Sequence, residues 1–261
     1  MAAERHSPYQ GLLPYDERDA PFFFGRERET RLIVANLFAA PLTILYGPSG
    51  VGKSSVLRAG VLRQLRTRDD LLVVPFSAWS GDPLHGLAAA LAEAVPATAP
   101  DHEPVLGSLA EQLSGWSDRL DRRVMILLDQ FEEYFLYRPG DDPFAVELPK
   151  ALSNRARALS VVISIREDSL AKLDRFEGVI PSLFDNYLRL DHLDREAARA
   201  AIEKPIDQYN RLCITAGAPF HIEAAMVEAV LDEVRTGSVV LGEAGRGVTR
   251  AEAAAARIET P

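Results

Sequence analysis

One stretch of eight residues has the spacing of a phosphate-binding loop. It reads Gly47, Pro48, Ser49, Gly50, Val51, Gly52, Lys53 and Ser54, which fits the pattern G-x-x-x-x-G-K-[ST]. Glycines let the backbone curl around an anion with its N–H groups pointing inward, and a helix that follows adds its positive N-terminal end. In such loops the lysine reaches the β- and γ-phosphates, and the last hydroxyl binds Mg²⁺. We therefore expect residues 47–54 and the adjoining Ser55 to bind the nucleotide, with Lys53 at its phosphates and the Ser54 hydroxyl on Mg²⁺.

A carboxylate follows a buried-strand pattern further along the chain. Residues 124–128 are all apolar, and Asp129 comes directly after them. At the end of a strand beside the loop, Asp129 would help to hold Mg²⁺; alternatively, it only caps the next segment. Glu132 and Glu133 follow. We expect Glu133 to orient the attacking water, with Glu132 as the second choice, unless both acids only favour the positive end of a helix.

An arginine follows another apolar run. Arg166 comes directly after residues 161–165, so it lies at the end of a predicted strand, where nucleotides bind in open α/β sheets. Its guanidinium could contact the γ-phosphate. The alternative is an ion pair with Glu167 or Asp168, and the residues alone do not decide between the two.

Apolar runs alternate with helical patterns through most of the chain. Strand-like runs lie at residues 42–46, 71–76, 124–128, 161–165 and 187–190. Helical spacing is found at residues 26–38, 53–65, 84–94 and 106–113. The alternation predicts an α/β fold, a P-loop NTPase parallel sheet with helices on both faces. Residues 194–204 and 222–235 are helical in pattern, which predicts a small helical domain after the sheet.

The chain divides into three expected parts. Residues 1–24 hold turn formers and aromatics without periodicity and are expected to form an arm. Residues 25–190 form the predicted P-loop NTPase core, and residues 191–261 the lid-like helical domain. Within the last part, residues 236–250 are expected to be a loop before a final alanine-rich helix.

Charge and composition narrow the possible partners. The formal net charge of −9 is opposite in sign to a phosphate-backbone-binding surface, so a nucleic-acid partner is not expected. The single cysteine, Cys213, excludes an internal disulfide and is expected to be a small buried apolar residue. No apolar run is long enough to cross a bilayer, so we expect no membrane partner and a cytoplasmic location.

Three segments together resemble a known family. Residues 24–29 (FGRERE), 129–133 (DQFEE) and 165–167 (IRE) look like those of STAND signalling ATPases, and most like the bacterial novel STAND subgroup, relatives of AAA+ ATPases. The resemblance spans essentially the whole chain. It implies that Phe24, Gly25 and Arg26 lie against adenine. The sequence also contains no guanine-binding motif, which favours adenine as the base. It also implies a switch that is closed with ADP and homo-oligomeric with ATP, working with effector and sensor domains.

The expected function is an ATP-binding, slowly hydrolysing signalling switch. Relative to the family, the helical domain looks truncated after Pro261, and the effector and sensor are expected in separate partners or in a longer protein. One alternative is a module that binds nucleotide without turnover, and another is a small-molecule P-loop kinase. The stimulus, the downstream effector, the oligomeric state and the hydrolysis rate do not follow from the residues.

Overall fold

The computed structural model describes residues 7–97, 99, 105–153, 159–180, 183–213 and 218–234. The expected loop at 236–250 and the helix after it lie outside these residues. The chain forms two compact units. One takes its described residues from Glu29–Ser49 and Val61–Leu190, and the other takes them from Met1–Arg28, Gly50–Gly60 and Asp191–Pro261. The chain therefore passes from one unit into the other inside the glycine-rich loop.

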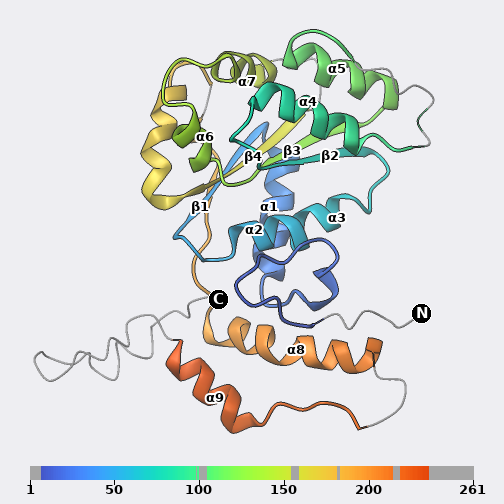
Figure 1. The fold of residues 1–261 in the computed structure, drawn as a ribbon, viewed down its shortest axis with the longest axis vertical. Coiled ribbons are helices and arrows are strands. Elements are labelled where there is room, and N and C mark those ends of the chain that lie inside the picture. Colours follow the sequence, from blue (N-terminus) through green and yellow to red (C-terminus); the bar gives the residue numbers. More distant parts are fainter. Residues whose placement is uncertain are drawn as a thin grey trace, which may run out of the picture. The chain divides into compact units, whose positions relative to one another are not determined.

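A five-stranded parallel sheet forms the centre of the first of these units (Figure 1). Its strands are β1 (Leu42–Gly47), β2 (Leu71–Phe76), β3 (Arg123–Leu128), β4 (Leu159–Arg166) and β5 (Tyr187–Arg189). Their order across the sheet is β2-β3-β4-β1-β5, and every neighbouring pair is parallel. The predicted parallel sheet is confirmed. Strand β4, late in the sequence, lies between the strand before the glycine-rich loop and the strand before Asp129.

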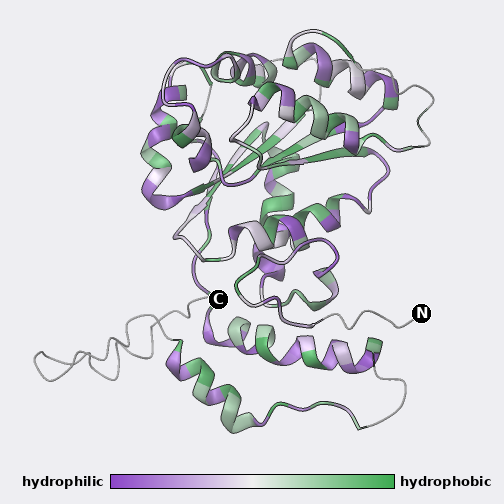
Figure 2. Ribbon diagram, in the orientation of Figure 1, coloured by the Kyte–Doolittle hydropathy of each residue, from purple (hydrophilic) through white to green (hydrophobic). Residues whose placement is uncertain are grey.

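The strands are buried because helices cover both faces of the sheet. Nearly all residues of β1 to β4 are buried, and Figure 2 shows these strands as hydrophobic ribbons. On one face, alternate strand residues such as Ile44, Ile126 and Ile163 join one apolar cluster. The helices that cover this face are α4 (Pro83–Ala94), α5 (Leu109–Leu120) and α7 (Pro143–Ser153), which pack against each other and against β2, β3 and β4.

Helix α1 (Glu27–Ala39) lies against the opposite face. Arg123, at the start of β3, donates from Nη2 to the carbonyl of Leu37 at 3.3 Å and to Oγ of Ser160 at 2.6 Å. Its guanidinium also lies 5.6 Å from the centre of the Phe38 ring. Because Ser160 alternates with the β4 residues of the apolar cluster, these contacts place the end of α1 on the other side of the sheet.

Several elements differ from the sequence-based expectation. The predicted helix at 53–65 is divided into α2 (Lys53–Ser55), a π-helical stretch η2 (Val56–Leu62) and α3 (Arg63–Leu65). The helix expected at 106–113 begins at Leu109, where Ser108 and Glu111 form a capping box, and continues to Leu120. Helices α6 (Glu132–Tyr137), α7 and η3 (Glu167–Phe176, a 3₁₀ helix) complete this unit.

The other unit contains the N-terminal arm, the second half of the glycine-rich loop with α2, and two longer helices. The arm includes a short 3₁₀ helix, η1 (Ala20–Phe22), and contacts α8 (Arg195–Cys213). Helix α9 (Ala224–Glu233) packs on α8 through a small apolar core of Leu193, Ala198, Val227 and Leu231. Cys213 is exposed at the end of α8, so the expectation of a buried cysteine is wrong. Among the described helices, none has the length and apolar character that a membrane span requires.

Candidate functional site

The glycine-rich loop connects the end of β1 to the start of α2. Gly50 and Gly52 have positive φ angles of 75° and 90°, a region that residues with a Cβ rarely adopt. A Cβ added to Gly50 would meet no atom within 4 Å, so the requirement for glycine there comes from the backbone conformation. Helix α2 begins at Lys53, directly after Gly52. The strand, loop and helix expected for a phosphate-binding loop are therefore present.

The second half of this loop is held by the N-terminal arm. Lys53 is buried, with 9% of its surface exposed. The backbone N–H of Tyr15 donates to Oγ of Ser55 at 3.1 Å. Nη2 of Arg26, which is 3% exposed, donates to the carbonyl of Val51 at 2.9 Å. One contact from the arm and one from Arg26, directly after it, thus fix the backbone on either side of Lys53 and Ser54.

The residues that the resemblance assigns to adenine also contact α8. Gly25 has a φ of 88°, and a Cβ there would lie 2.4 Å from the carbonyl oxygen of Ala197. The position therefore accepts only glycine without a shift of backbone. Nζ of Lys204 lies 5.9 Å from the centre of the Phe24 ring. Phe24, Gly25 and Arg26 thus connect α8 to the loop; contact with adenine stays a prediction.

Asp129 is buried where β3 ends. Its N–H donates to the carbonyl of Phe76 at 2.8 Å, which continues the pairing of β3 with β2. Its carbonyl accepts a 2.7 Å hydrogen bond from Nε1 of Trp79, and its Oδ1 accepts one from the N–H of Gln130 at 3.0 Å. Trp79 is itself enclosed by the rings of Phe76, Phe131, Tyr134 and Phe144. The backbone of Asp129 is therefore held firmly, with its carboxylate at the carboxyl edge of the sheet.

The two glutamates after Asp129 have different surroundings. Gln130 turns the chain with a φ of 54°, and the N–H of Phe131 donates to the carbonyl of Ser164 in β4 at 2.8 Å. Oε2 of Glu132 then accepts the N–H of Arg166 at 3.1 Å, so this carboxylate caps the end of β4. Glu133 is half-buried, and its carboxylate makes no hydrogen bond or ion pair with the residues the structure describes.

Arg166 lies beside the start of the glycine-rich loop. It pairs in register with Gly47, and Arg189 pairs similarly with Tyr46 on the other side of β1. Nη2 of Arg166 contacts Oδ2 of Asp168 at 2.5 Å, and this hydrogen bond lowers the pKa of the Asp168 carboxyl. The ion pair foreseen as the alternative role of Arg166 is therefore present. Arg189 makes two hydrogen bonds, of 2.9 and 3.0 Å, to Glu167.

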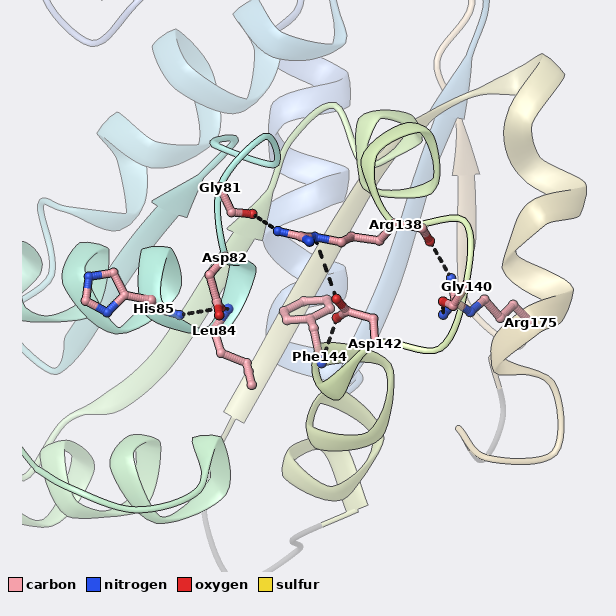
Figure 3. A network of polar contacts seen from close by, with 9 residues as sticks. All are labelled: Gly81, Asp82, Leu84, His85, Arg138, Gly140, Asp142, Phe144 and Arg175. Carbon is pink, nitrogen blue, oxygen red and sulfur yellow. Dashed lines mark hydrogen bonds and ion pairs between the residues drawn. The ribbon is translucent and has the colours of Figure 1, made fainter.

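A polar network supports helix α6, which carries Glu132 and Glu133. Figure 3 shows Arg138, just after this helix, between Gly81 and Asp142. Its Nη2 donates to the Gly81 carbonyl at 2.6 Å, and its Nε lies 3.6 Å from Oδ2 of Asp142. Arg175, near the end of η3, donates to the carbonyls of Arg138 and Gly140. The segments after β3 and after β4 are therefore joined twice. Glu132 and Arg166 connect them at the edge of the sheet, and Arg175 connects them further from it.

An aromatic side chain of α6 completes this support. The guanidinium of Arg175 lies 5.6 Å from the centre of the Tyr134 ring. Burial raises the pKa of Tyr134 to about 12, so its hydroxyl stays protonated at neutral pH. The ring contacts Trp79, Phe131 and Phe144, which also surround the backbone of Asp129.

The donor set suits a nucleotide with Mg²⁺. Mg²⁺ takes oxygen ligands, and the carboxylate of Asp129 and hydroxyl of Ser54 are such groups. The backbone N–H groups of the glycine-rich loop and the ammonium of Lys53 suit phosphate oxygens. Sequence patterns had singled out all of these residues. The sequence patterns do not indicate three further residues near the site, because their positions depend on how the strands are arranged in the sheet: Trp79, Ser164 and Arg189.

Comparison with known proteins gives a family and a fold. A family model described as novel STAND NTPase 1 matches residues 8–245. The Walker-type ATPase of Pyrococcus abyssi superposes with a TM-score of 0.58 at 18% identity, over 87% of this chain and 67% of that one. The ORC2 protein of Aeropyrum pernix in its ADPNP–ADP complexes gives a TM-score of 0.54 at 13% identity, over 86% and 59%.

A third solved structure, Cdc6p from Pyrobaculum aerophilum, gives a TM-score of 0.53 at 13% identity, over 90% of this chain and 59% of that one. At such identities the likeness establishes the fold alone. The chain spans 59% to 67% of the length of these three solved chains. No curated protein matches the chain.

Proposed function

The chain belongs to the novel STAND NTPase 1 family, and we propose that it acts as a switch whose state is set by bound ATP or ADP. The family and fold make it a P-loop NTPase of the STAND and AAA+ type. Slow hydrolysis would return the switch to its ADP state. Adenine is the proposed base because the segment Phe24 to Arg26 resembles the adenine-contacting segment of STAND proteins.

The proposed chemistry assigns one role to each residue of the site. The glycine-rich loop and Lys53 bind the β- and γ-phosphates, and Ser54 and Asp129 hold Mg²⁺. Mg²⁺ would offset the charge on the β- and γ-phosphate oxygens. Glu133 orients a water molecule and accepts its proton as the water oxygen bonds to the γ-phosphorus. The bond from that phosphorus to the bridging oxygen then breaks, which leaves ADP and inorganic phosphate.

The surroundings of the two glutamates support Glu133 over Glu132 in this role. The Glu132 carboxylate already accepts the N–H of Arg166, whereas that of Glu133 is half-buried and has no partner among the described residues. A general base needs a lone pair available to the water. We propose further that the Arg166 guanidinium exchanges Asp168 for the γ-phosphate, which ADP lacks.

One observation carries the proposal of a switch: the second half of the phosphate-binding loop, the arm and α8 belong to a single compact unit. Arg26 contacts Val51, Gly25 packs on Ala197, and the hydroxyl of Tyr9 donates to the carbonyl of Ile202 at 2.5 Å. A continuous set of contacts therefore runs from the backbone of the loop to α8, along which a change in the loop could be transmitted. A ligand shifts such an equilibrium only by contacting its two states differently, as ATP and ADP would.

Partners follow from the same proposal. We propose that the ATP state forms a homo-oligomer and that sensor and effector parts, in other proteins or in a longer chain, set and transmit the state. A net charge of −9 gives no support to a nucleic-acid partner.

Hydrogen exchange tests the switch. With Mg²⁺ present, we expect the amides of α8 and α9 to exchange at different rates with a non-hydrolysable ATP analogue and with ADP, because only the former carries a γ-phosphate. Lys53→Ala, tested with the same nucleotides, should remove the difference. Equal protection in both states, in a protein that binds both nucleotides, would leave a nucleotide-binding module without a switch.

A further inference from the structure

Strand β4 contains a buried hydroxyl that folding leaves unpaired. Ser164 is fully buried, and its Oγ makes no hydrogen bond with the residues the structure describes. Ser160, four residues earlier on the same face of the strand, is equally buried, but its Oγ accepts a hydrogen bond from Arg123. Thr43 in β1 is also fully buried, and its Oγ1 accepts from Nδ2 of Asn186 at 2.8 Å. Ser164 is the exception among these three.

An unpaired hydroxyl weakens a folded protein, because it loses its hydrogen bonds to water and gains none in return. Alanine would fill this position on β4 without that loss. Buried polar groups in native proteins are nearly always paired, so the exception calls for a reason other than folding.

The position of Ser164 supplies the reason. Leu128 of β3 pairs with Ile163 of β4, so the next residues of the two chains, Asp129 and Ser164, follow side by side. Leu128 and Ile163 both face the apolar cluster, and side chains alternate along a strand, so Asp129 and Ser164 share the opposite face. The hydrogen bond from the N–H of Phe131 to the Ser164 carbonyl holds the two segments together.

The same face continues to the strand before the glycine-rich loop. Ser164 pairs in register with Leu45, and Arg166 with Gly47, the first residue of the loop. Ser164 therefore lies between the strand that leads into the loop and the segment that carries Asp129. Metal-binding carboxylates are usually held in orientation by hydrogen bonds from neighbouring groups.

We propose that Ser164 is a positioning residue for Mg²⁺: its hydroxyl donates a hydrogen bond to the Asp129 carboxylate when that carboxylate holds the cation of a bound nucleotide. This inference rests on the proposed function, because it assumes that Asp129 serves Mg²⁺. Ser164 itself touches neither nucleotide nor cation. The hydroxyl has no partner among the described residues because the Asp129 carboxylate takes up the accepting orientation when it holds the cation.

Two alanine variants on one face of β4 test the inference. Calorimetry would measure ATP affinity of the full chain across a range of Mg²⁺ concentrations and in a chelator, and thermal unfolding would be followed without nucleotide. Ser164→Ala should unfold at the wild-type temperature or above, yet require about 10-fold more Mg²⁺ for ATP binding. In the chelator its ATP affinity should equal that of wild type. Ser164→Thr, which keeps a hydroxyl, should restore much of the Mg²⁺ response.

Ser160→Ala is the matched control. It should lower the unfolding temperature, because Arg123 loses a partner, and leave the Mg²⁺ dependence unchanged. If Ser164 acts through Asp129, the double variant Ser164→Ala, Asp129→Asn should lose no more Mg²⁺ response than Asp129→Asn alone.

Three results would overturn the inference: a wild-type Mg²⁺ dependence in Ser164→Ala, a loss of affinity equally large in the chelator, or a lower unfolding temperature for Ser164→Ala. Each of these leaves the proposed function in place. A wild-type chain that binds no ATP at all would instead overturn the proposed function, and the inference with it.

Discussion

Asp129 and the four residues after it differ in the contacts that they make at the edge of the sheet. Asp129 is held through its backbone by Phe76 and Trp79, and Gln130 turns the chain with a positive φ. The turn brings Glu132 to the N–H of Arg166 and leaves the carboxylate of Glu133 half-buried without a partner among the described residues. Two adjacent acids of the same type thus have different surroundings: Glu132 caps the end of β4, whereas Glu133, unpaired among the described residues, has the free lone pairs that its proposed role as a base requires.

This difference predicts that a change at Glu133 affects the rate of hydrolysis, whereas a change at Glu132 affects stability. Glu133→Gln should bind ATP as wild type does but hydrolyse it about 100-fold more slowly or worse, because the amide cannot accept a proton. Glu132→Ala should lower the free energy of unfolding by about 1–3 kcal/mol, because the N–H of Arg166 loses its acceptor. Single-turnover hydrolysis and urea unfolding would measure the two effects.

A Glu133→Gln protein with wild-type turnover would remove Glu133 from the mechanism. If hydrolysis were slowed only in Glu132→Gln, Glu132 would be the residue that orients the water. Bound ATP without turnover in the wild type itself would favour the module that binds nucleotide without hydrolysis.

At the scale of elements, the arm is the least expected part of the site. Residues 7–24 lack periodicity, yet they contribute hydrogen bonds to Ser55 and Ile202 and lead into the contacts of Gly25 and Arg26. The arm is also held by its own polar contacts: Nε2 of Gln10 and the N–H of Asp16 both donate to the buried carboxylate of Asp19. It is therefore an ordered element that joins the loop to α8.

Gly11 of the arm and Gly25, directly after the arm, give a matched test of that contact. Gly11 and Gly25 both have positive φ, at 65° and 88°, but a Cβ would meet no atom at Gly11 and the Ala197 carbonyl at Gly25. Gly11→Ala should cost only the strain of the left-handed backbone, about 1–2 kcal/mol. Gly25→Ala should cost about 2–5 kcal/mol, because overpacking adds to that strain.

Urea unfolding of the two variants would compare these costs, and hydrogen exchange of α8 would locate the effect. Protection of α8 should fall in Gly25→Ala and stay at the wild-type level in Gly11→Ala. Equal losses of stability with unchanged exchange in α8 would contradict the packing of the arm on this helix.

Strands β1 to β4 were well predicted because each is a short apolar run that is almost entirely buried, which the residues alone reveal. Strand β5, at the edge of the sheet, is largely exposed. The segment from 132 to 176 was predicted less well. Helix α7 contains Pro149, a residue that disfavours a helix interior, and η3 is a 3₁₀ helix of ten residues, which is longer than such helices usually are. The start of α5 could have been found, because Ser108 and Glu111 have the spacing of a capping box.

The residues of the candidate site that belong to a motif could be predicted from the sequence. Those that depend on the order of the strands could not. Residues 47–54 and Asp129 can be located by counting along the chain. Ser164 and Arg189 cannot, because a single polar residue in an apolar run has no meaning until β4 and β5 are known to flank β1. That order results from packing between residues far apart in sequence, which local patterns do not carry.

In the molecule as a whole, the glycine-rich loop is one of the places where the chain passes between its two compact units. One unit contains the sheet edge with Asp129, Glu133 and Arg166, and the other contains Lys53, the arm and α8. The proposed switch depends on nucleotide binding at this loop.

Calorimetric titration with Mg²⁺–ATP measures nucleotide binding at the loop itself. The wild-type chain should bind both ATP and ADP, and Lys53→Ala should lose ATP binding while it keeps the wild-type circular dichroism spectrum, because the ammonium that meets the phosphates is gone. Lys172→Ala, which removes an exposed lysine of η3, controls for the loss of one positive charge and should bind as wild type does. Equal ATP affinity in Lys53→Ala and the wild type would contradict the assignment of the loop and the function built on it.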